Sequence, residues 1–568
     1  MTAQPGGTAL LQTVTSLREL LSDLALPLDI TGVELARRDR RDLIAQLDDY
    51  VIPRLADLDA PLLAVVGGST GAGKSTLVNT LAGRVVSRSG VLRPTTRAPV
   101  LVHHADDTAW FTTPRVLPGL RRVTGADLTH DDPSSVRLVA AHGLPAGIAL
   151  VDAPDIDSVV QANRELARQL LAAADLWLFT TTAARYADAV PWDLLRHAVE
   201  RGASVAIVLN RVPEEALDPI GDHLAEMLSD RGLRHAPLFV LAETELTDSG
   251  LLPEDQVQPI REWLTRLGQD ARARGLVVGR TLGGTLDAVE RRTTELAEAS
   301  FAQIQTVQEL DAILDTAFRD ALAEVSTGIS DGTLLRGEVL ARWQQFVGTG
   351  EFLKRVESRI SGWRDRVTAV LTGHPAPSPE LGEVLQSGVA QLIVAHAEGA
   401  AMTTARRWRA VPGGAAIVIK QPHLARLSEG FHQRAQQEVR AWQGDILELV
   451  RAEGKDRRTT ARLLAFGLNA VGVVLMLVVF SHTMGLSGGE VGIAGGSAVL
   501  AQRLLEAIFG DQAVRVLAEK ARQLLVDRTT ALYRGEQARI ADGLTEVQVD
   551  VEQPERLLAA VASMRVAR

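Results

Sequence analysis

The spacing of apolar residues changes twice along the chain, and the first stretch, residues 8–57, has the spacing of helices. An apolar residue recurs every three or four positions up to Pro27, a residue that a helix interior does not tolerate, and a second stripe follows. We therefore predict two helices whose apolar positions belong to the core. These positions are Leu10, Val14, Leu17, Leu21 and Leu24 in the first stripe and Leu35, Ile44, Leu47, Val51 and Leu55 in the second.

Residues 61–245 have a different pattern, in which short apolar runs alternate with helical stretches. Runs that are apolar on both faces and separated by helices are typical of a mainly parallel sheet covered on both sides. We therefore predict an α/β domain here. The expected strands are Leu62–Val66, Pro99–His103, Ile148–Asp152, Leu176–Thr180, Val205–Asn210 and Leu238–Ala242.

From residue 255 to the end the pattern is again mostly helical. Amphipathic stretches predict long helices over about 284–372, 423–460 and 503–541 and a last helix near 554–566. Two segments rich in proline or glycine, Gly373–Pro379 and Val411–Gly414, predict breaks between helices. The fold class predicted for the whole chain is an α/β domain followed by a large all-α region.

The loop after the first predicted strand matches the phosphate-binding motif G-x-x-x-x-G-K-[ST]. It lies between an apolar strand and a helical pattern, as the motif requires, so its backbone N–H groups are expected to face a phosphate chain at a helix N-terminus. Lys74 is expected to reach the β- and γ-phosphates and Ser75 to ligate Mg²⁺. The predicted binding residues are Gly68, Ser69, Thr70, Gly71, Ala72, Gly73, Lys74, Ser75 and Thr76.

Two further residues are candidates for the magnesium site and for catalysis together with Lys74. Asp152 ends the apolar run that begins at Ile148, the placement of a carboxylate that holds Mg²⁺ through water in P-loop NTPases. Thr96 lies in the polar segment Arg93–Arg97, where a threonine after the first helix can complete the metal shell and sense the γ-phosphate. We therefore predict Ser75, Thr96 and Asp152 around the metal.

The order of these motifs resembles GTPases of the translation-factor class, of the Era-like and dynamin-like kind, over about residues 61–245. The P-loop, Pro94-Thr-Thr96-Arg97, Asp152-Ala-Pro-Asp155 and Asn210-Arg211 follow one another as in that family. The resemblance implies GTP as substrate with Mg²⁺, with Asn210 and Arg211 at the position of the guanine-reading N-K-x-D. Leu241-Ala242-Glu243 stands where the family has its S-A-K motif.

The sequence departs from this family at four positions, of which Arg211, in place of the lysine of N-K-x-D, is a mild change. Asp155 replaces the glycine whose N–H contacts the γ-phosphate, and Thr70 stands where dynamins carry a catalytic glutamine. Pro213 replaces the aspartate that reads guanine, so the preference for GTP over ATP loses its main physical support. The sequence leaves ATP open as a substrate and predicts slow hydrolysis or a need for a second subunit or partner. Carboxylates that could substitute for the missing aspartate are Glu214, Glu215 and Asp218.

A segment near the C-terminus is a candidate for membrane insertion. Leu463–Phe480 is almost wholly apolar over 18 residues, with Asn469 as the main exception. As a helix it would be about 27 Å long, close to the hydrocarbon thickness of a bilayer. A weaker glycine-rich run over 484–502 contains Glu490, and basic residues lie on both sides of the pair, which favours a two-pass or re-entrant hairpin entering from the cytoplasmic face. The alternative is a helical hairpin buried in protein.

Composition and charge narrow the function classes. The 60 basic and 70 acidic residues give a formal charge of −10, which argues against a dedicated nucleic-acid binder. The chain has no cysteine, which excludes disulfides, cysteine-ligated metal sites and thiol catalysis. Leu486–Glu490 matches the ABC-transporter signature, but it lies far beyond the P-loop domain and no strand ending in Asp-Glu follows it, so we interpret it as a coincidence.

The layout resembles that of bacterial dynamin-like proteins. We predict N-terminal helices packing on a stalk over 1–57, a GTPase-like domain over 58–250 and a helical stalk over 251–460. A membrane hairpin is expected over 461–505 and returning stalk helices over 506–568. The resemblance implies a GTPase at the cytoplasmic face of the cell membrane that assembles as a homo- or hetero-oligomer through its nucleotide domains and stalk.

Two functions follow as hypotheses. The first is a dynamin-like GTPase that remodels or tethers membranes, with cell division as one setting implied by the resemblance. The second is a slow-hydrolysing nucleotide switch that anchors or recruits a partner at the membrane, which the absence of a catalytic glutamine favours. An ATPase of the ABC type is the weakest alternative.

Overall fold

The computed structural model describes residues 5–88, 98–124, 132–155, 161–188, 192, 195–196, 198, 203–330, 379–453, 509 and 511–568. The chain divides into two compact units, and each has its own core. The first comprises Met1–Leu26, Gly32–Phe301 and Asp550–Arg568, and the second Pro27–Thr31 and Ala302–Val549. Helix α10 (Ala271–Ser330) contributes residues to both.

The first unit is built on an eight-stranded sheet with the order β3-β4-β2-β5-β1-β6-β7-β8. All neighbouring strands pair in parallel except β2 and β5, so the predicted mainly parallel α/β domain is confirmed. Each of the six predicted strands is present. The strands are β1 (Leu62–Gly68), β2 (Val100–His103), β3 (Arg121–Thr124), β4 (Ser135–Ala140), β5 (Ile148–Asp152), β6 (Leu176–Thr182), β7 (Ser204–Val212) and β8 (Leu238–Ala242).

Strands β3 and β4 were not predicted from the sequence. They lie at one end of the strand order, and arginines interrupt their apolar pattern. Arg121 and Arg122 begin β3, which is largely exposed, whereas β4 buries Arg137. The Arg137 guanidinium bonds to the carbonyl of Val86, so the burial of this charged side chain is compensated by a contact that is distant in sequence.

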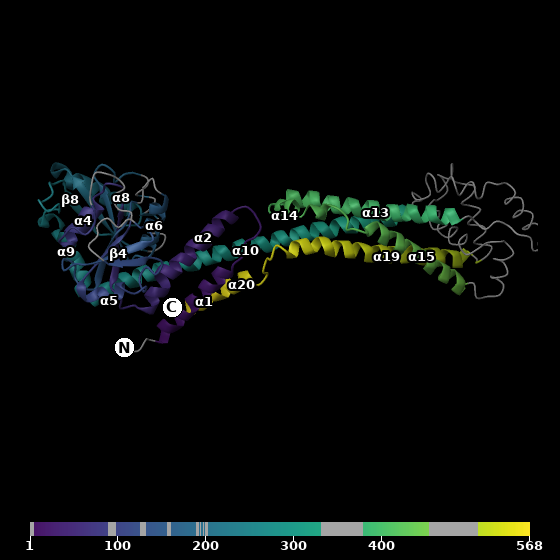
Figure 1. Ribbon diagram of the computed structural model, residues 1–568, viewed down its shortest axis with the longest axis horizontal. Helices are drawn as coiled ribbons and strands as arrows, with labels where there is room; N and C mark the ends of the chain where they lie inside the picture. Colours follow the sequence, from purple (N-terminus) through teal and green to yellow (C-terminus); the bar gives the residue numbers. More distant parts are fainter. Residues whose placement is uncertain are drawn as a thin grey trace, which may run out of the picture. The chain divides into compact units, whose positions relative to one another are not determined.

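Helices cover both faces of this sheet (Figure 1). Helices α4 (Lys74–Ala82) and α9 (Glu254–Gln269) pack on one face through apolar side chains such as Leu77 and Ile260. Helices α6 (Gln161–Ala172) and α8 (Leu217–Asp230) pack on the other. Because successive residues of β1 point alternately to the two faces, its run of apolar residues contributes to both layers. Shorter helical turns are η2 (Ala105–Asp107), α5 (Thr108–Phe111) and η3 (Glu214–Ala216).

The N-terminal helices belong to the same unit. Helix α1 (Pro5–Asp23) packs against the last helix, α20 (Gln553–Ala567), and the four predicted core positions on α1 are buried, as is Leu24 directly after it. The second stripe is only partly correct, because Leu35 is 70% exposed on α2 (Val33–Gln46). The middle of α2 is rich in arginine and aspartate, so burial is confined to its ends. The π-helix η1 (Leu47–Val51) and α3 (Ile52–Ala56) follow it and bury Leu47, Val51 and Leu55 as predicted.

The second unit is helical. Its described helices are the end of α10, α13 (Pro379–Ala410), α14 (Gly414–Lys420), η5 (Pro422–Ala425), α15 (Phe431–Glu453) and α19 (Asp511–Thr545). Helices α10, α13, α15 and α19 run alongside one another (Figure 1). The predicted break at Val411–Gly414 is confirmed, because α13 ends at Ala410 and α14 begins after Gly413 in the left-handed conformation.

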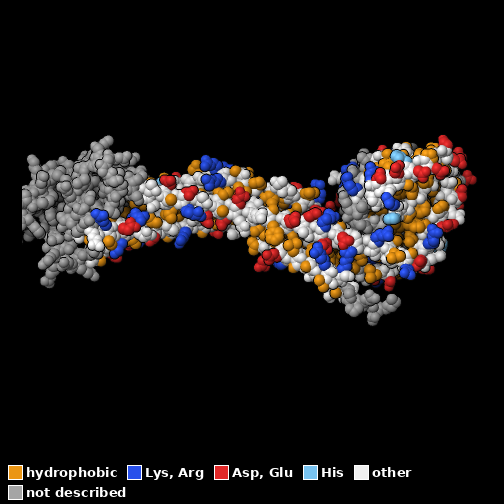
Figure 2. Space-filling view, turned by 180° about the vertical axis from the view of Figure 1, so that it is seen from behind, with side chains coloured by type: hydrophobic (Ala, Val, Ile, Leu, Met, Phe, Trp, Pro, Cys, Tyr) orange, Lys and Arg blue, Asp and Glu red, His pale blue; other side chains and the backbone are white. Residues whose placement is uncertain are grey.

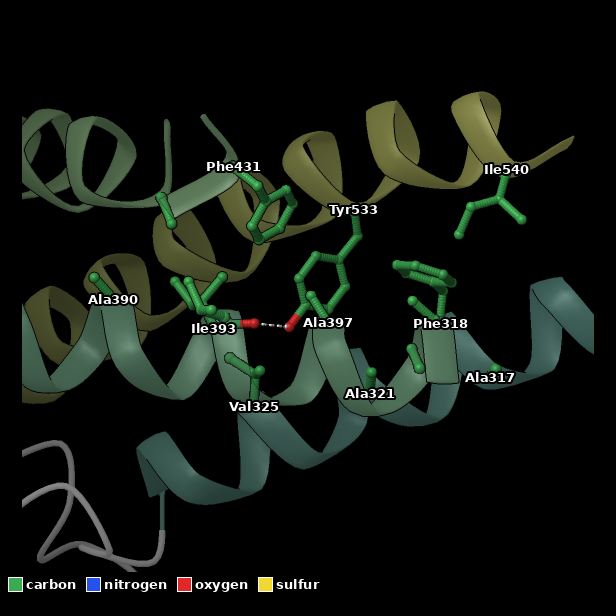
Figure 3. Close-up of a cluster of buried hydrophobic side chains, with 14 of the residues drawn as sticks. Ala317, Phe318, Ala321, Val325, Ala390, Ile393, Ala397, Phe431, Tyr533 and Ile540 are labelled. Atoms are coloured by element: carbon green, nitrogen blue, oxygen red, sulfur yellow. Dashed lines mark hydrogen bonds between the residues drawn. The ribbon is translucent and has the colours of Figure 1, made fainter. Parts of the chain in front are cut away.

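Hydrogen bonds from buried aromatic side chains fix how these helices pack. Tyr533 on α19 donates to the carbonyl of Ile393 on α13 at 2.7 Å and meets Phe318 on α10 edge to face, with ring centroids 5.7 Å apart (Figure 3). The Trp408 indole donates to the Leu310 carbonyl at 2.8 Å. A buried ring that also bonds to a neighbouring helix fixes position as well as contributing apolar burial. Alanines on the facing turns allow the close approach.

A buried ion pair connects α3 to the sheet of the first unit. The Arg54 guanidinium pairs with Asp175, which directly precedes β6 and is fully buried. The same Asp175 carboxylate accepts from the N–H of Leu63 at 2.8 Å. Burial raises the pKa of Asp175, while Arg54 and the Leu63 N–H oppose that shift. The strand that leads into the phosphate loop is therefore held at its beginning by a charged contact.

No helix in the part of the chain that the structure describes is long and apolar enough to cross a bilayer. The predicted hairpin over 461–505 lies outside the described residues, as do the ABC-like segment Leu486–Glu490 and Thr96. Of the predicted break at Gly373–Pro379, only Pro379 is described, and it begins α13.

We predict that Arg54→Ala destabilises the first unit strongly, because the variant leaves the Asp175 carboxylate buried without its cation. Breaking a buried pair in this way costs about 3–5 kcal/mol, which corresponds to a fall in unfolding temperature on the order of 10 °C. Scanning calorimetry measures the change. Arg115→Ala is the matched control, because Arg115 and its partner Asp57 are exposed; equal losses for both variants would contradict the prediction.

Candidate phosphate-binding site

The loop between β1 and α4 has little room for side chains. Gly68, Gly71 and Gly73 adopt φ values of 149°, 80° and 90°, a region that favours glycine. A Cβ on Gly68 would lie 2.0 Å from the Thr180 carbonyl oxygen of β6, and a Cβ on Gly73 would lie 2.4 Å from Nδ2 of Asn210. The loop therefore wraps against the ends of β6 and β7, and its glycines are required by contact as well as by backbone conformation.

Lys74 lies at the centre of the loop as the first residue of α4. Its ammonium nitrogen donates to the carbonyl oxygens of Gly68 and Ser69, both at 3.0 Å, and to Oδ1 of Asp155 at 2.5 Å. The Lys74 side chain is 5% exposed. A cation is thus held where the loop and the helix N-terminus together attract anionic oxygens.

Other residues of the predicted phosphate loop have defined partners or burial. Ser69 is buried, and its hydroxyl has no hydrogen-bond partner among the described residues. The Ala72 N–H donates to the Ser69 carbonyl at 3.2 Å, which closes the turn. Thr76 lies in the first turn of α4, where its carbonyl accepts from the Thr80 hydroxyl.

Ser75 and Asp152 meet as the sequence predicts. The Ser75 hydroxyl donates to Oδ2 of Asp152 at 2.7 Å, although the two residues are far apart in the chain. The pairing register explains the contact, because Asp152 at the end of β5 lies opposite Val66 of β1, shortly before the loop. The parallel strands therefore bring the loop hydroxyl and the carboxylate to the same edge of the sheet.

A second hydroxyl, that of Ser87, reaches the same carboxylate and was not predicted. The Ser87 hydroxyl donates to Oδ2 of Asp152 at 2.5 Å. The Asn79 side chain fixes the backbone of this segment, since its Oδ1 accepts from the N–H groups of Val86 and Ser87 and its Nδ2 donates to the Ser87 carbonyl, each at 2.8 Å. Nothing in the sequence around Ser87 marks this role, because it arises where the chain turns back after α4.

The two oxygens of Asp152 have different surroundings. Oδ2 accepts from both serines, whereas Oδ1 is buried and has no hydrogen-bond partner among the described residues. Burial raises the pKa of Asp152, and the hydroxyls of Ser87 and Ser75 and the charge of Lys74 oppose that shift. An unpartnered carboxylate oxygen beside a P-loop serine suits Mg²⁺, which prefers oxygen ligands and retains water. These residues fit a magnesium ion held by Ser75 directly and by Asp152 through water.

The described residues contain no cluster of three or more His, Asp or Glu side chains with metal-binding geometry. A P-loop site does not require such a cluster, because Mg²⁺ there takes most of its ligands from substrate phosphates and water. Thr96, the third predicted metal ligand, lies outside the described residues, so its place at the metal stays a prediction.

Asn210 lies against the phosphate loop. Its Nδ2 donates to the Ala72 carbonyl at 2.9 Å, and its Oδ1 accepts from the N–H of Arg211 at 2.9 Å. Arg211 is exposed and has a φ of 56°. The N–H of Glu243, just after β8, donates to the Val212 carbonyl at 2.8 Å, which brings the loop after β8 to the same edge of the sheet as Asn210.

The position that reads guanine in the resembling family carries no hydrogen-bonding side chain here. Pro213 directly precedes η3, and the three carboxylates that follow it are exposed. These are Glu214, Glu215 and Asp218.

Arg185 is a further residue at the loop that was not predicted. It follows β6, and its Nη1 donates to the Thr70 carbonyl at 3.1 Å while its Nε pairs with Asp188 at 3.2 Å. A guanidinium therefore lies beside the loop position where dynamins carry a glutamine. An arginine in a loop after a strand carries no sequence signal for this contact, which depends on β6 lying next to β1.

Comparison with known proteins finds structural similarity at low sequence identity. The chain is similar to two structures of an oligomerised bacterial dynamin pair, described as a mechanism for long-range sensing and tethering of membranes. Both are 12% identical to this chain, with a TM-score of 0.43. The first match covers 98% of this chain and 95% of the bacterial dynamin chain. The second match covers 100% of this chain and 96% of the bacterial dynamin chain. It is also similar to Era in complex with MgGDPNP and nucleotides of 16S ribosomal RNA, at 19% identity and a TM-score of 0.23, over 36% of this chain and 57% of Era.

No protein-family model and no curated protein matches the chain. A bacterial dynamin and Era, the proteins in these three structures, are of the kinds that the sequence motifs resemble.

We predict that Asp152→Asn stabilises the ligand-free protein near neutral pH while removing stabilisation by Mg²⁺ and nucleotide. The raised pKa means that folding favours the protonated carboxyl, so the stability it contributes is present below the unfolded-state pKa of about 3.9 and is lost as the pH rises through the folded-state value. The asparagine variant avoids that loss.

Thermal unfolding with and without Mg²⁺ and nucleotide, at pH 4 and pH 7.5, measures both effects of Asp152→Asn. The gain in unfolding temperature should shrink toward pH 4. Asp248→Asn is the control, because Asp248 is exposed and should show neither effect. A variant that keeps the full ligand-induced shift would place Asp152 outside the metal site.

We also predict that Gly73→Ala weakens Mg²⁺-nucleotide binding by more than about tenfold, because its Cβ would clash with Asn210. Gly83→Ala is a matched control, since Gly83 also has a left-handed conformation, with φ 74°, but a Cβ there meets nothing within 4 Å. Both variants carry the backbone strain, about 1 kcal/mol, and only the first carries the clash. Titration calorimetry that finds equal affinities for the two variants would contradict the assigned contact.

Proposed function

We propose that this protein is a Mg²⁺-dependent nucleoside-triphosphatase that uses GTP. The observation that carries the proposal is the convergence of Lys74, Ser75 and Asp152, with the Ser75 hydroxyl 2.7 Å from the Asp152 carboxylate and the Lys74 ammonium within the loop. A buried cation, a metal-binding hydroxyl and a strand-end carboxylate at one helix N-terminus are the parts that phosphoryl transfer from a nucleotide requires.

In this proposal each residue has a distinct task. Backbone N–H groups of the loop and the N-terminus of α4 bind the phosphate chain, and Lys74 neutralises the charge of the β- and γ-phosphates. Ser75 and Asp152 hold Mg²⁺, which draws the phosphate oxygens together and offsets the charge that develops during transfer. Asn210 holds the loop in shape through the Ala72 carbonyl. The reaction converts a nucleoside triphosphate and water to the diphosphate and phosphate.

Discrimination between GTP and ATP is expected to be weak. A site that hydrogen-bonds a substrate group rejects an analogue that lacks the group by several orders of magnitude, and Pro213 removes the acceptor that would supply this selectivity. We propose GTP as the substrate because the order of the motifs resembles that of GTPases. Because Pro213 removes the guanine-reading acceptor, we expect ATP to compete.

A slow nucleotide switch is the second candidate, and a specific contact favours it. Lys74 is paired with Asp155, so its ammonium is engaged by a carboxylate of the chain itself. Thr70 also leaves the loop without the glutamine that dynamins use for hydrolysis. In this form the protein binds nucleotide, turns it over slowly and recruits a partner at the membrane.

We further propose that the protein acts at the cytoplasmic face of a membrane as an oligomer, remodelling or tethering it, with cell division as one setting. The membrane part rests on the sequence of Leu463–Phe480 and its basic flanks. Basic and acidic side chains are interspersed on the face drawn in Figure 2, and the formal charge is −10, which argues against a dedicated nucleic-acid partner.

Turnover by the full-length chain tests this proposal. We expect Mg²⁺-dependent phosphate release from GTP, with less than about a hundredfold preference over ATP because the guanine-reading carboxylate is absent. Anionic liposomes should raise the rate if the membrane remodels with turnover, and leave a slow rate unchanged if the protein is a switch. Lys74→Ala should abolish phosphate release, and a rate equal to that of the unmodified chain would refute the site.

A further inference from the structure

Asp155 occupies the place on Lys74 that a phosphate oxygen would need. An ammonium group has three N–H donors, and among the described residues Lys74 Nζ donates to the carbonyls of Gly68 and Ser69 and to the Asp155 carboxylate, each within 3.0 Å. Two of these acceptors are neutral and belong to the loop backbone. The third is anionic and belongs to a side chain that is 15% exposed, so it is the contact that can be exchanged.

A carboxylate resembles a phosphate oxygen in the features that a lysine recognises, namely negative charge and strong acceptance of hydrogen bonds. Asp155 lies three residues after Asp152, which is the last residue of β5. The end of this strand therefore presents both carboxylates at the loop. A triphosphate therefore meets a loop lysine, Lys74, whose charge is already paired.

We propose that Asp155 competes with the γ-phosphate for Lys74 and thereby lowers the affinity of the site for triphosphate relative to diphosphate. The inference rests on the proposed function and adds the residue that sets this selectivity. A diphosphate brings only its β-phosphate to Lys74 and leaves the γ-position empty, so the Asp155 carboxylate can remain beside the ammonium. A triphosphate must displace the carboxylate and then accommodate it beside its own negative charge.

The competition has a defined thermodynamic form. When the binding-competent state is only a fraction of the population, the apparent dissociation constant rises by the inverse of that fraction. Pairing of Lys74 with Asp155 reduces the competent fraction for triphosphate alone. After hydrolysis the same pairing disfavours rebinding of phosphate.

Equilibrium binding to the full-length chain tests the proposal. The probes are a fluorescent non-hydrolysable GTP analogue and the matching fluorescent GDP, both with Mg²⁺. Asp155→Asn keeps the size of the side chain and removes its charge, and Asp155→Gly introduces the glycine of the resembling family. For both variants we expect triphosphate affinity to rise about tenfold and diphosphate affinity to change less than about threefold.

The controls separate this proposal from simpler explanations. Asp248→Asn removes an exposed charge distant in sequence from the loop and should leave both affinities unchanged. If Asp155 were only a structural partner of Lys74, its variants would unfold at clearly lower temperature and bind both nucleotides more weakly. That result would overturn the inference, as would an unchanged ratio of the two affinities.

Lys74→Ala distinguishes failure of this inference from failure of the proposed function. If Lys74→Ala binds triphosphate as tightly as the unmodified chain, the phosphate site itself is wrong. If Lys74→Ala loses binding but Asp155→Asn leaves the ratio unchanged, the site is right and the competition is wrong.

Discussion

The close approach of the β1–α4 loop to the ends of its neighbouring strands is the constraint on which the site depends. β1 lies between β5 and β6, and β7 lies beyond β6, so one edge of the sheet brings three strand ends to the loop. The loop can follow this edge only where it lacks side chains, as at Gly68 and Gly73. The same closeness brings Ser75 within 2.7 Å of Asp152 and lets Asn210 bond to the loop backbone.

The charged groups of Lys74, Asp152 and Asp155 lie close together at this end of the strands and interact with one another. One ammonium, that of Lys74, faces two carboxyl groups, Asp155 at 2.5 Å and Asp152 nearby. Burial makes the ionised form of Asp152 costly, and a divalent cation beside it would reverse that cost. The arrangement suits a site whose charge is completed by a metal ion and phosphate together, because the single ammonium is paired with Asp155 and, among the described residues, leaves the buried Asp152 carboxyl without a cation of its own.

The two units achieve their packing by different means. In the first, apolar strands are covered by helices on both faces, and a buried ion pair between Arg54 and Asp175 fixes the approach to β1. In the second, long helices pack through small residues, and hydrogen bonds from Tyr533 and Trp408 to main-chain carbonyls specify which turns face each other. Ridges of apolar side chains alone allow several neighbouring registers, and a directed hydrogen bond favours one of them.

Features that depend on neighbouring residues were predictable from the sequence, namely the six apolar strands, the glycine-lysine loop and the carboxylate at the end of β5. The sequence also marked Asp155 as a departure from the resembling family. Tertiary structure alone decided that Ser87 shares Asp152 with Ser75, that Arg185 reaches the loop, that Asp155 pairs with Lys74 and that Leu35 is exposed. The local pattern of residues indicates which of them prefer burial or a given backbone conformation. The partner of a polar side chain depends instead on strands and turns that are tens of residues away. The spacing of residues along the chain therefore does not predict that partner.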